Sequence, residues 1–242
     1  MDARDPEGSG EKVAIITGAS QGIGAGLTTA YRQLGYAVVA TARSMEPSED
    51  AGIVTVAGDI ADPDTAQRVV EEAVERFGRI DTLINNAGSY IGKPFTDYTL
   101  EDFNALIAVN LAGFFHITKR TIGQMLDQGR GHVVNVSTTL VEQADSSTPA
   151  ALSVLTKGGL VAATGSLAIE YASRGLRVNA VSLGVIKTQI HDEASYAGLG
   201  ALHPLGRVGE IEDVVGGVLY LESAPFVTGE ILHIDGGQSA GH

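Results

Sequence analysis

The sequence predicts one doubly wound α/β domain, in which a seven-stranded parallel sheet carries helices on both faces. Short, nearly continuous apolar runs rich in β-branched residues alternate along the chain with longer amphipathic stretches, which is typical of a buried parallel sheet. The chain has 242 residues, of which 44% are hydrophobic, so it is long and apolar enough for one large core. We expect this single domain to span residues 12–242, behind a polar, glycine-rich and disordered tail over residues 1–11.

Each strand is expected where an apolar run is short, and each helix where apolar residues recur at helical spacing. The predicted strands are residues 12–17, 37–41, 52–58, 81–86, 132–137, 176–182 and 230–235. The predicted helices between them are residues 23–34, 62–77, 100–127 and 149–173. Pro149 follows three hydroxyl residues and is the expected first residue of the last of these helices, since proline is favoured there and a hydroxyl caps the helix. In such a sheet, ligands bind at the carboxyl ends of the strands, near the point where the strand order reverses.

Composition argues against several classes of function. The chain has no cysteine, which excludes disulfides and thiol catalysis, and its six histidines lack metal-ligand spacing, so no metal site is expected. A net charge of −13 argues against nucleic acid as a partner, because phosphate binding needs clustered lysine and arginine. No apolar run reaches the roughly 18 residues of a membrane span, and the first residues lack an apolar signal, so we expect a cytoplasmic protein without a membrane partner.

A glycine-rich loop follows the first predicted strand directly. Residues 17–24 read TGASQGIG and place Gly18, Gly22 and Gly24 between a strand and a helix. Glycine there allows a tight turn and lets backbone N–H groups approach a pyrophosphate at the helix N-terminus. A purely structural turn is the alternative, but the position between strand and helix favours dinucleotide binding by a Rossmann-type fold.

The end of the second predicted strand indicates which dinucleotide binds. NAD-specific sites usually place an acidic side chain here for the ribose 2′-hydroxyl, whereas an arginine accommodates a 2′-phosphate. This chain reads Thr41-Ala42-Arg43, with an arginine and no acid. NADP(H) is therefore favoured over NAD(H), the alternative being that Arg43 is a solvated loop residue.

With these motifs in place, the chain resembles the short-chain dehydrogenase/reductase family over about residues 12–237. The resemblance rests on motifs in a fixed order: TGASQGIG at 17–24, Asp59-Ile60 after the third strand, NNAG at 85–88, Asn110 in VNLAG, Lys157, and the terminal VTGEILHIDGG. It implies a nicotinamide-dependent oxidoreductase that acts on a small-molecule substrate and assembles as a homotetramer or homodimer.

The resemblance also implies which residues serve the cofactor and the chemistry. Asp59 and Ile60 would flank the adenine, and Ile186 and Thr188 would hold the nicotinamide carboxamide. Cofactor binding as a whole falls on Gly18, Ser20, Gln21, Gly22, Ile23, Gly24, Arg43, Asp59, Ile60, Asn86, Ala87, Gly88, Lys157, Ile186 and Thr188. The catalytic positions fall on Asn110, Thr138, Ser153 and Lys157, with Thr138 in place of the usual serine.

One catalytic position departs from the family pattern. The family's usual proton donor is a tyrosine four residues before the lysine, and this chain has Ser153 there. In the family's enoyl-reductase branch the tyrosine lies seven residues before the lysine, and that position is Ala150. A second departure is Leu183-Gly184, where the family usually has Pro-Gly. Ser153 and Lys157 still share one face of the predicted helix, because they are four residues apart.

A serine hydroxyl is a much weaker acid than a tyrosine, and general acid–base catalysis contributes roughly 10²–10⁴-fold, so a replacement is needed. Ser153 could relay a proton from Lys157 through water. Another side chain could serve, either Tyr90 or, in a predicted lid at 187–203, His191 or Tyr196. The substrate could also need little protonation, as with an iminium or a conjugated double bond. We expect reduction of a C=O, C=N or conjugated C=C group; the competing hypothesis is a non-redox enzyme or cofactor-binding protein on the same scaffold.

Overall fold

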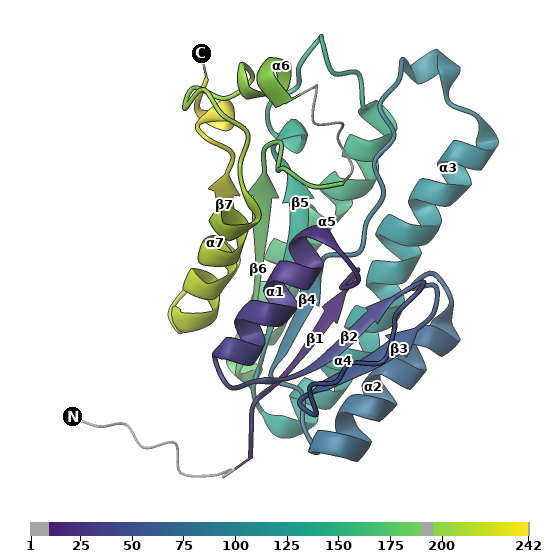
Figure 1. Cartoon of the computed structure of the whole chain (residues 1–242), viewed down its shortest axis with the longest axis vertical. Helices are drawn as coiled ribbons and strands as arrows, with labels where there is room; N and C mark the ends of the chain where they lie inside the picture. Colours follow the sequence, from purple (N-terminus) through teal and green to yellow (C-terminus); the bar gives the residue numbers. More distant parts are fainter. Residues whose placement is uncertain (1–9, 190–195, 242) are drawn as a thin grey trace.

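The computed structural model describes residues 10–189 and 196–241, and it contains the predicted seven-stranded sheet (Figure 1). The predicted tail lies almost wholly outside these residues. All strand pairs are parallel, in the order β3-β2-β1-β4-β5-β6-β7. The strands are β1 (Val13–Thr17), β2 (Ala37–Ala42), β3 (Ile53–Ala57), β4 (Thr82–Asn85), β5 (Gly131–Thr138), β6 (Leu176–Leu183) and β7 (Ile231–Ile234). Each lies close to its predicted range, because a continuous apolar run suits a strand that is buried on both faces.

Helices cover both faces of the sheet and build two apolar cores. The helices on one face are α1 (Gly22–Gln33) and α7 (Ile211–Ser223), and those on the other are α2 (Pro63–Phe77), α4 (Phe114–Gln128) and α5 (Ala151–Tyr171) (Figure 1). Leu27 and Val218 are fully buried in the first core, and Val69 and Ile117 in the second. The doubly wound, Rossmann-type prediction is confirmed.

The strand order reverses between β1 and β4. From this pair, β2 and β3 extend the sheet in one direction and β5 to β7 in the other. The connections after β1 and β4 therefore lead away from each other and open a crevice at the carboxyl ends of the strands, where doubly wound folds bind ligands. The short helix α6 (Tyr196–Gly200) lies beyond this edge, at the top of Figure 1.

The region predicted as one helix over residues 100–127 is divided. It consists of α3 (Leu100–Leu106), a π-helical segment (Ile107–Gly113) and α4. A π-helical turn inside a longer helix is rare and is frequently found at functional sites. Asn110, one of the predicted catalytic residues, lies in this segment.

The predicted start of the next helix, at Pro149, is wrong. Helix α5 begins at Ala151, after a cap residue whose side chain makes no capping hydrogen bond. The Ser147 hydroxyl donates instead to Asp145, within a turn that the Thr148 N–H closes onto the Asp145 carbonyl oxygen. These hydroxyl residues therefore shape a turn before the helix.

Helix α5 with its final turn, Ala151–Arg174, is long and apolar enough to cross a membrane by length and composition alone. In the structure it packs against β5 and β6. That is the place of a covering helix in a doubly wound sheet, whose apolar face is part of the core.

Candidate active site

A cleft of about 830 Å³ opens at the carboxyl ends of the strands, within the size range of small-ligand sites. Its walls come mostly from segments that follow β1 to β6, with Gln238 after β7. The predicted site residues on these walls are Gly18, Ser20, Gln21, Gly22, Ile23, Arg43, Asp59, Ile60, Asn86, Ala87, Gly88, Thr138, Lys157, Ile186 and Thr188. The fold thus brings most of the predicted set into one cleft.

The loop after β1 has a backbone suited to close approach. Gly18 has a φ of 66°, in the left-handed region that favours glycine. Gly24 lies beneath the loop, where a Cβ would be 2.2 Å from the Gly18 carbonyl oxygen. Asn86 ties the loop after β4 to this one, because its Nδ2 donates to the carbonyl oxygens of Thr17 (2.9 Å) and Gly18 (3.2 Å). The two loops at the switch point are therefore held together.

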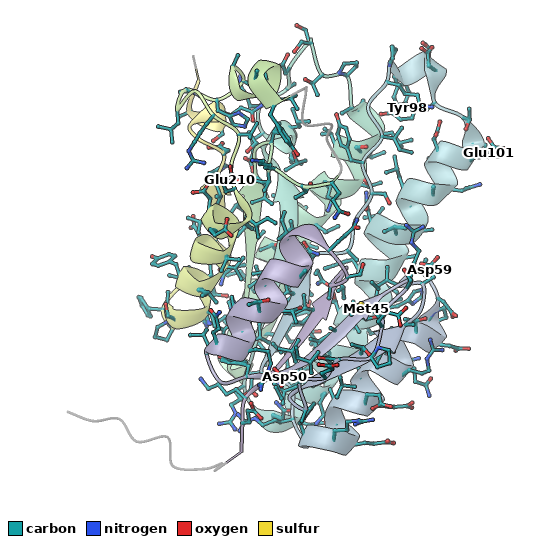
Figure 2. All side chains as sticks on the ribbon, in the orientation of Figure 1. Met45, Asp50, Asp59, Tyr98, Glu101 and Glu210 are labelled. Atoms are coloured by element: carbon teal, nitrogen blue, oxygen red, sulfur yellow. The ribbon has the colours of Figure 1, made fainter. Side chains whose placement is uncertain are left out.

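The end of the cleft beside β2 and β3 carries the polar side chains of Thr41, Arg43 and Asp59. The Thr41 hydroxyl is buried and has no hydrogen-bond partner among the described residues. Arg43 is exposed on the cleft wall. Asp59, labelled in Figure 2, follows β3, and its carboxylate accepts from the Ala61 N–H at 2.9 Å. An unpaired buried hydroxyl costs about 1–3 kcal/mol. Thr41 and Arg43 both lie on this wall of the cleft, which fits a ligand with ribose hydroxyls and a phosphate.

Lys157 lies at the other end of the cleft, on α5. Its Nζ donates to the Val136 carbonyl oxygen at 2.9 Å. It also lies against Gly88, where a Cβ would be 2.6 Å from Nζ, so glycine leaves room for the ammonium group. Burial lowers the pKa of Lys157 from 10.5 to about 8. Burial therefore makes this ammonium group a stronger acid than that of an exposed lysine.

The Ser153 hydroxyl faces the loop after β4 and not the cleft. It is buried, accepts from the Ile91 N–H and donates to the Ile91 carbonyl oxygen, both at 2.9 Å. Tyr98, labelled in Figure 2, donates to the same carbonyl oxygen at 2.7 Å. Ser153 and Lys157 do share the helix face that meets this loop, as their spacing predicts. Both hydrogen bonds of the serine hydroxyl, however, are made with the backbone of the loop.

The side chain of Asn110 also forms its hydrogen bonds within the chain. Its Oδ1 accepts from the Ser89 N–H (2.8 Å), and its Nδ2 donates to the Ser89 carbonyl oxygen (3.0 Å) and to Thr156 Oγ1 (2.9 Å). Thr138 differs, because it lies on the cleft wall and its hydroxyl accepts from the Leu140 N–H at 3.4 Å, which leaves its proton for a ligand. Of the four predicted catalytic residues, the structure places Thr138 and Lys157 at the cleft.

The three side chains considered as replacement proton donors lie in different places. Tyr90 lines the cleft, and burial raises the pKa of its phenol. Tyr196 is the first residue of α6 and donates its hydroxyl to the Thr188 carbonyl oxygen at 2.9 Å. His191 lies outside the described residues.

Several polar residues on the cleft wall were not predicted as site residues from the sequence, among them Thr41, Ser147, Thr148 and Gln238. Thr41 adjoins the motif that contains Arg43, which was the available signal. Gln238 directly follows the terminal Gly-Gly pair, and its place in the cleft depends on the return of the chain past β7.

His203 holds the turn where the family usually has proline. Its Nε2 accepts from the Val185 N–H at 3.0 Å, so the ring is neutral and its Nδ1 donates to the Leu199 carbonyl oxygen at 3.1 Å. The histidine thus joins the segment after α6 to the end of β6. Within the described residues, no group of histidine, aspartate or glutamate side chains is arranged to hold a metal ion.

The fold and the cleft define a class, the doubly wound α/β proteins that bind nucleotides at the switch point of the sheet. A family model described as enoyl-(acyl carrier protein) reductase matches residues 18–239. The chain is 36% identical to the 3-oxoacyl-[acyl-carrier-protein] reductase FabG of Thermotoga maritima, over 93% of this chain and 97% of that one. It is 38% identical, with the same coverage, to an uncharacterized oxidoreductase of Methylorubrum extorquens. The solved structure of ElxO with NADP bound has a TM-score of 0.89 at 28% identity, over 96% of this chain and 100% of that one.

The chain therefore belongs to the short-chain dehydrogenase/reductase family of oxidoreductases.

Proposed function

We propose that the protein is an NADP(H)-dependent oxidoreductase that reduces a C=O, C=N or conjugated C=C group of a small organic substrate with an altered proton donor. The observation that carries this proposal is one continuous cleft with Arg43 at its β2 end and Lys157 at its β5 end. Phosphate recognition and redox chemistry would then occupy opposite ends of the same cleft.

The cleft residues fit the parts of this cofactor. Arg43 and Thr41 are suited to the 2′-phosphate and adenosine ribose, with Asp59 and Ile60 beside the adenine. Gly18 and residues 20–23 line the cleft at the start of α1, where backbone N–H groups at a helix N-terminus are suited to a pyrophosphate. When bound, the cofactor supplies or accepts a hydride. Lys157 has N–H donors left for the nicotinamide ribose and the substrate.

A ketone is the first substrate class to test, because the Thermotoga maritima relative is named as a 3-oxoacyl reductase. We propose a homotetramer, or a homodimer, located in the cytoplasm. Phe115, Leu155 and Ile169 on α4 and α5 are 56%, 62% and 82% exposed in the single chain, and a second copy would cover them.

The proposal is tested with purified protein, NADPH and a panel of ketones, 3-oxoacyl thioesters, imines and enones, followed by nicotinamide absorbance. We expect oxidation of NADPH with one substrate class, and slower oxidation of NADH. Tight NADPH binding without turnover across the panel would contradict the redox function.

The second candidate is a protein that binds the cofactor without redox turnover. It is favoured by the engagement of Ser153 and Asn110 with backbone groups of the loop after β4. The same panel discriminates the two, since this candidate binds NADPH and leaves it reduced.

A further inference from the structure

The lysine of this cleft stands without the tyrosine that accompanies it in the family pattern. We propose that the ammonium group of Lys157 itself gives the proton to the substrate in reduction and takes it up in oxidation, while Ser153 is a structural residue. The inference rests on the proposed redox function and names the group that completes it.

Ser153 is unsuited to proton transfer because its hydroxyl already donates and accepts. Both hydrogen bonds go to the backbone of Ile91 at 2.9 Å, and the residue is 1% exposed. A relay through Ser153 would have to break both bonds and detach the loop from α5. Its role is to fasten the loop after β4 beside the lysine.

The other hydroxyls at this end of the cleft are poor acids or are engaged. Ser137 donates to the Lys157 carbonyl oxygen at 3.3 Å, and Ser147 donates to Asp145 at 2.7 Å. Thr138 is free to donate a hydrogen bond, but an aliphatic hydroxyl is a much weaker acid than an ammonium group. Burial raises the pKa of the Tyr90 phenol, which moves it away from the neutral range where a general acid works best.

Lys157 has the geometry that these groups lack. It lies on the cleft wall, and one of its three N–H bonds is used on the Val136 carbonyl oxygen, so two remain for a ligand. The contact with Gly88 confines Nζ from the side of the β4 loop. The hydrogen bond from Ser137 fastens the lysine's own backbone to β5.

No described carboxylate lies close enough to keep the ammonium group protonated. The elements around it are β5, the loop after β4 and α5, and the other ionisable side chain that they bring to the cleft is Tyr90. Arg43 and Asp59 follow β2 and β3, three and four strand positions from β5, which is roughly 14–19 Å at the spacing of strands in a sheet. Burial alone therefore lowers the pKa of Lys157, to about 8.

The proton transfer balances with these groups. In reduction of a ketone, the carbonyl carbon receives the hydride, and the π pair moves to oxygen. The oxygen forms an O–H bond with a proton of Lys157, whose N–H pair stays on nitrogen as the lone pair of a neutral amine. The amine regains a proton from water in the open cleft, so the substrate gains one hydride and one proton.

The protonation of Lys157 can be measured without any substrate. The chain has five lysines, so protein labelled with carbon-13 at lysine Cε gives few NMR signals, and the one absent from Lys157→Met belongs to Lys157. We expect that signal to titrate near pH 8, well below the ordinary lysine value of about 10.4. A Lys157 signal that titrates near the ordinary value would overturn the inference.

The role in catalysis is tested by chemical rescue at saturating NADPH. Lys157→Ala is expected to lose about 10²-fold or more of its turnover on the ketone that the unaltered protein reduces. Added methylamine or ethylamine should restore part of it, with a rate that depends on the pKa of the amine. A lysine that merely positions the cofactor would not give this dependence. Lys119→Ala, at an exposed lysine of α4 outside the cleft wall, is the matched control and should keep the turnover and pH profile of the unaltered protein.

The outcomes separate the two proposals. Turnover by the unaltered protein without amine rescue of Lys157→Ala contradicts the role of the lysine alone. Absence of turnover in the unaltered protein contradicts the redox function, and it therefore also contradicts the role of the lysine as proton donor.

Discussion

The two ends of the central sheet hold their polar side chains in opposite ways. At the amino-terminal end, the Glu222 carboxylate in the last turn of α7 accepts hydrogen bonds from Tyr31, Tyr36, Thr82 and His132, at 2.9–3.1 Å. At the carboxyl end, the Thr41 hydroxyl has no partner among the described residues, and Lys157 Nζ has one. One end is complete inside the chain, and the other is left for a ligand.

His132 lies beside Glu222 at the amino-terminal end of the sheet, and its imidazole is neutral. Burial lowers its pKa, and its Nε2 faces Asn179 Nδ2, a donor, at 3.1 Å. Its proton is therefore on Nδ1, which donates to Glu222. Burial by itself raises the pKa of Glu222, but hydrogen bonds from His132, Tyr36 and Thr82 outweigh it and lower the pKa to about 2.

The difference shows where stability and function divide in this fold. A buried polar group that is fully hydrogen-bonded helps to specify the structure, whereas one left unpaired costs free energy until a ligand arrives. Changes at the Glu222 end should therefore alter unfolding without altering cofactor binding. Changes at the cleft end should alter cofactor binding, and removal of an unpaired buried group there should also raise the free energy of unfolding.

The largest expected effect comes from breaking the complete end. Glu222→Ala should lower the free energy of unfolding by about 3–5 kcal/mol, because four donors lose their acceptor. Urea denaturation measures this. Glu75→Ala, an exposed glutamate of α2, is the control and should change the value by less than about 0.5 kcal/mol. Weaker NADPH binding by the folded Glu222→Ala variant would contradict the division between a structural end and a ligand-binding end of the sheet.

The same carboxylate predicts a loss of stability in acid. Its pKa is about 2 in the folded protein and about 4.3 in the unfolded chain, so its contribution is present above about pH 4.3 and is lost as the pH falls toward 2. The difference corresponds to about 3 kcal/mol as an order of magnitude. Denaturation of the unaltered protein and of Glu222→Gln across this range should give curves that converge in acid. Parallel curves would contradict the assignment of this acid-dependent stability to the Glu222 carboxylate.

At the open end, Arg43→Ala should weaken NADPH binding by about tenfold, or 1.4 kcal/mol, and leave NADH unaffected. The reason is the loss of a guanidinium beside the expected 2′-phosphate. Fluorescence titration with both cofactors measures this. Arg76→Ala, an exposed arginine paired with Glu72 on α2, is the matched control. If the binding of NADPH and of NADH weakens equally, Arg43 contacts a part of the ligand that both cofactors share and not the 2′-phosphate.

The smallest expected effect concerns Thr41, and it tests most directly whether the carboxyl end of the sheet is left open for a ligand. Thr41→Val removes a buried hydroxyl that has no partner among the described residues, so the free energy of unfolding should rise by up to about 1 kcal/mol, while NADPH binds a few-fold more weakly. Thr121→Val is the control, because within the same residues its hydroxyl is also unpaired, but it lies on α4, away from the cleft wall. It should raise stability without changing NADPH affinity. The same affinity loss in both variants would contradict a role for Thr41 in the site.

The order of strands and helices and the glycine-rich loop could be read from the sequence, because each depends on short-range patterns. A run of apolar residues such as 12–17 forms a strand wherever both faces are buried, and TGASQGIG needs its glycines for a local turn. Arg43 reaches the cleft because it follows the carboxyl end of β2, and Lys157 reaches it from the amino-terminal part of α5.

The hydrogen-bond partners depended on tertiary structure. Ser153 has the expected spacing from Lys157, but its hydroxyl bonds to Ile91, 62 residues earlier, through the packing of α5 on the loop after β4. Glu222 gathers donors from four distant segments in the same way. Burial follows a local period that a sequence displays, whereas a polar side chain bonds to whatever the folded chain places within about 3 Å of it. The sequence therefore determined that a dinucleotide cleft would form here, and the tertiary packing decided that its serine would hold a loop while its lysine faces the ligand.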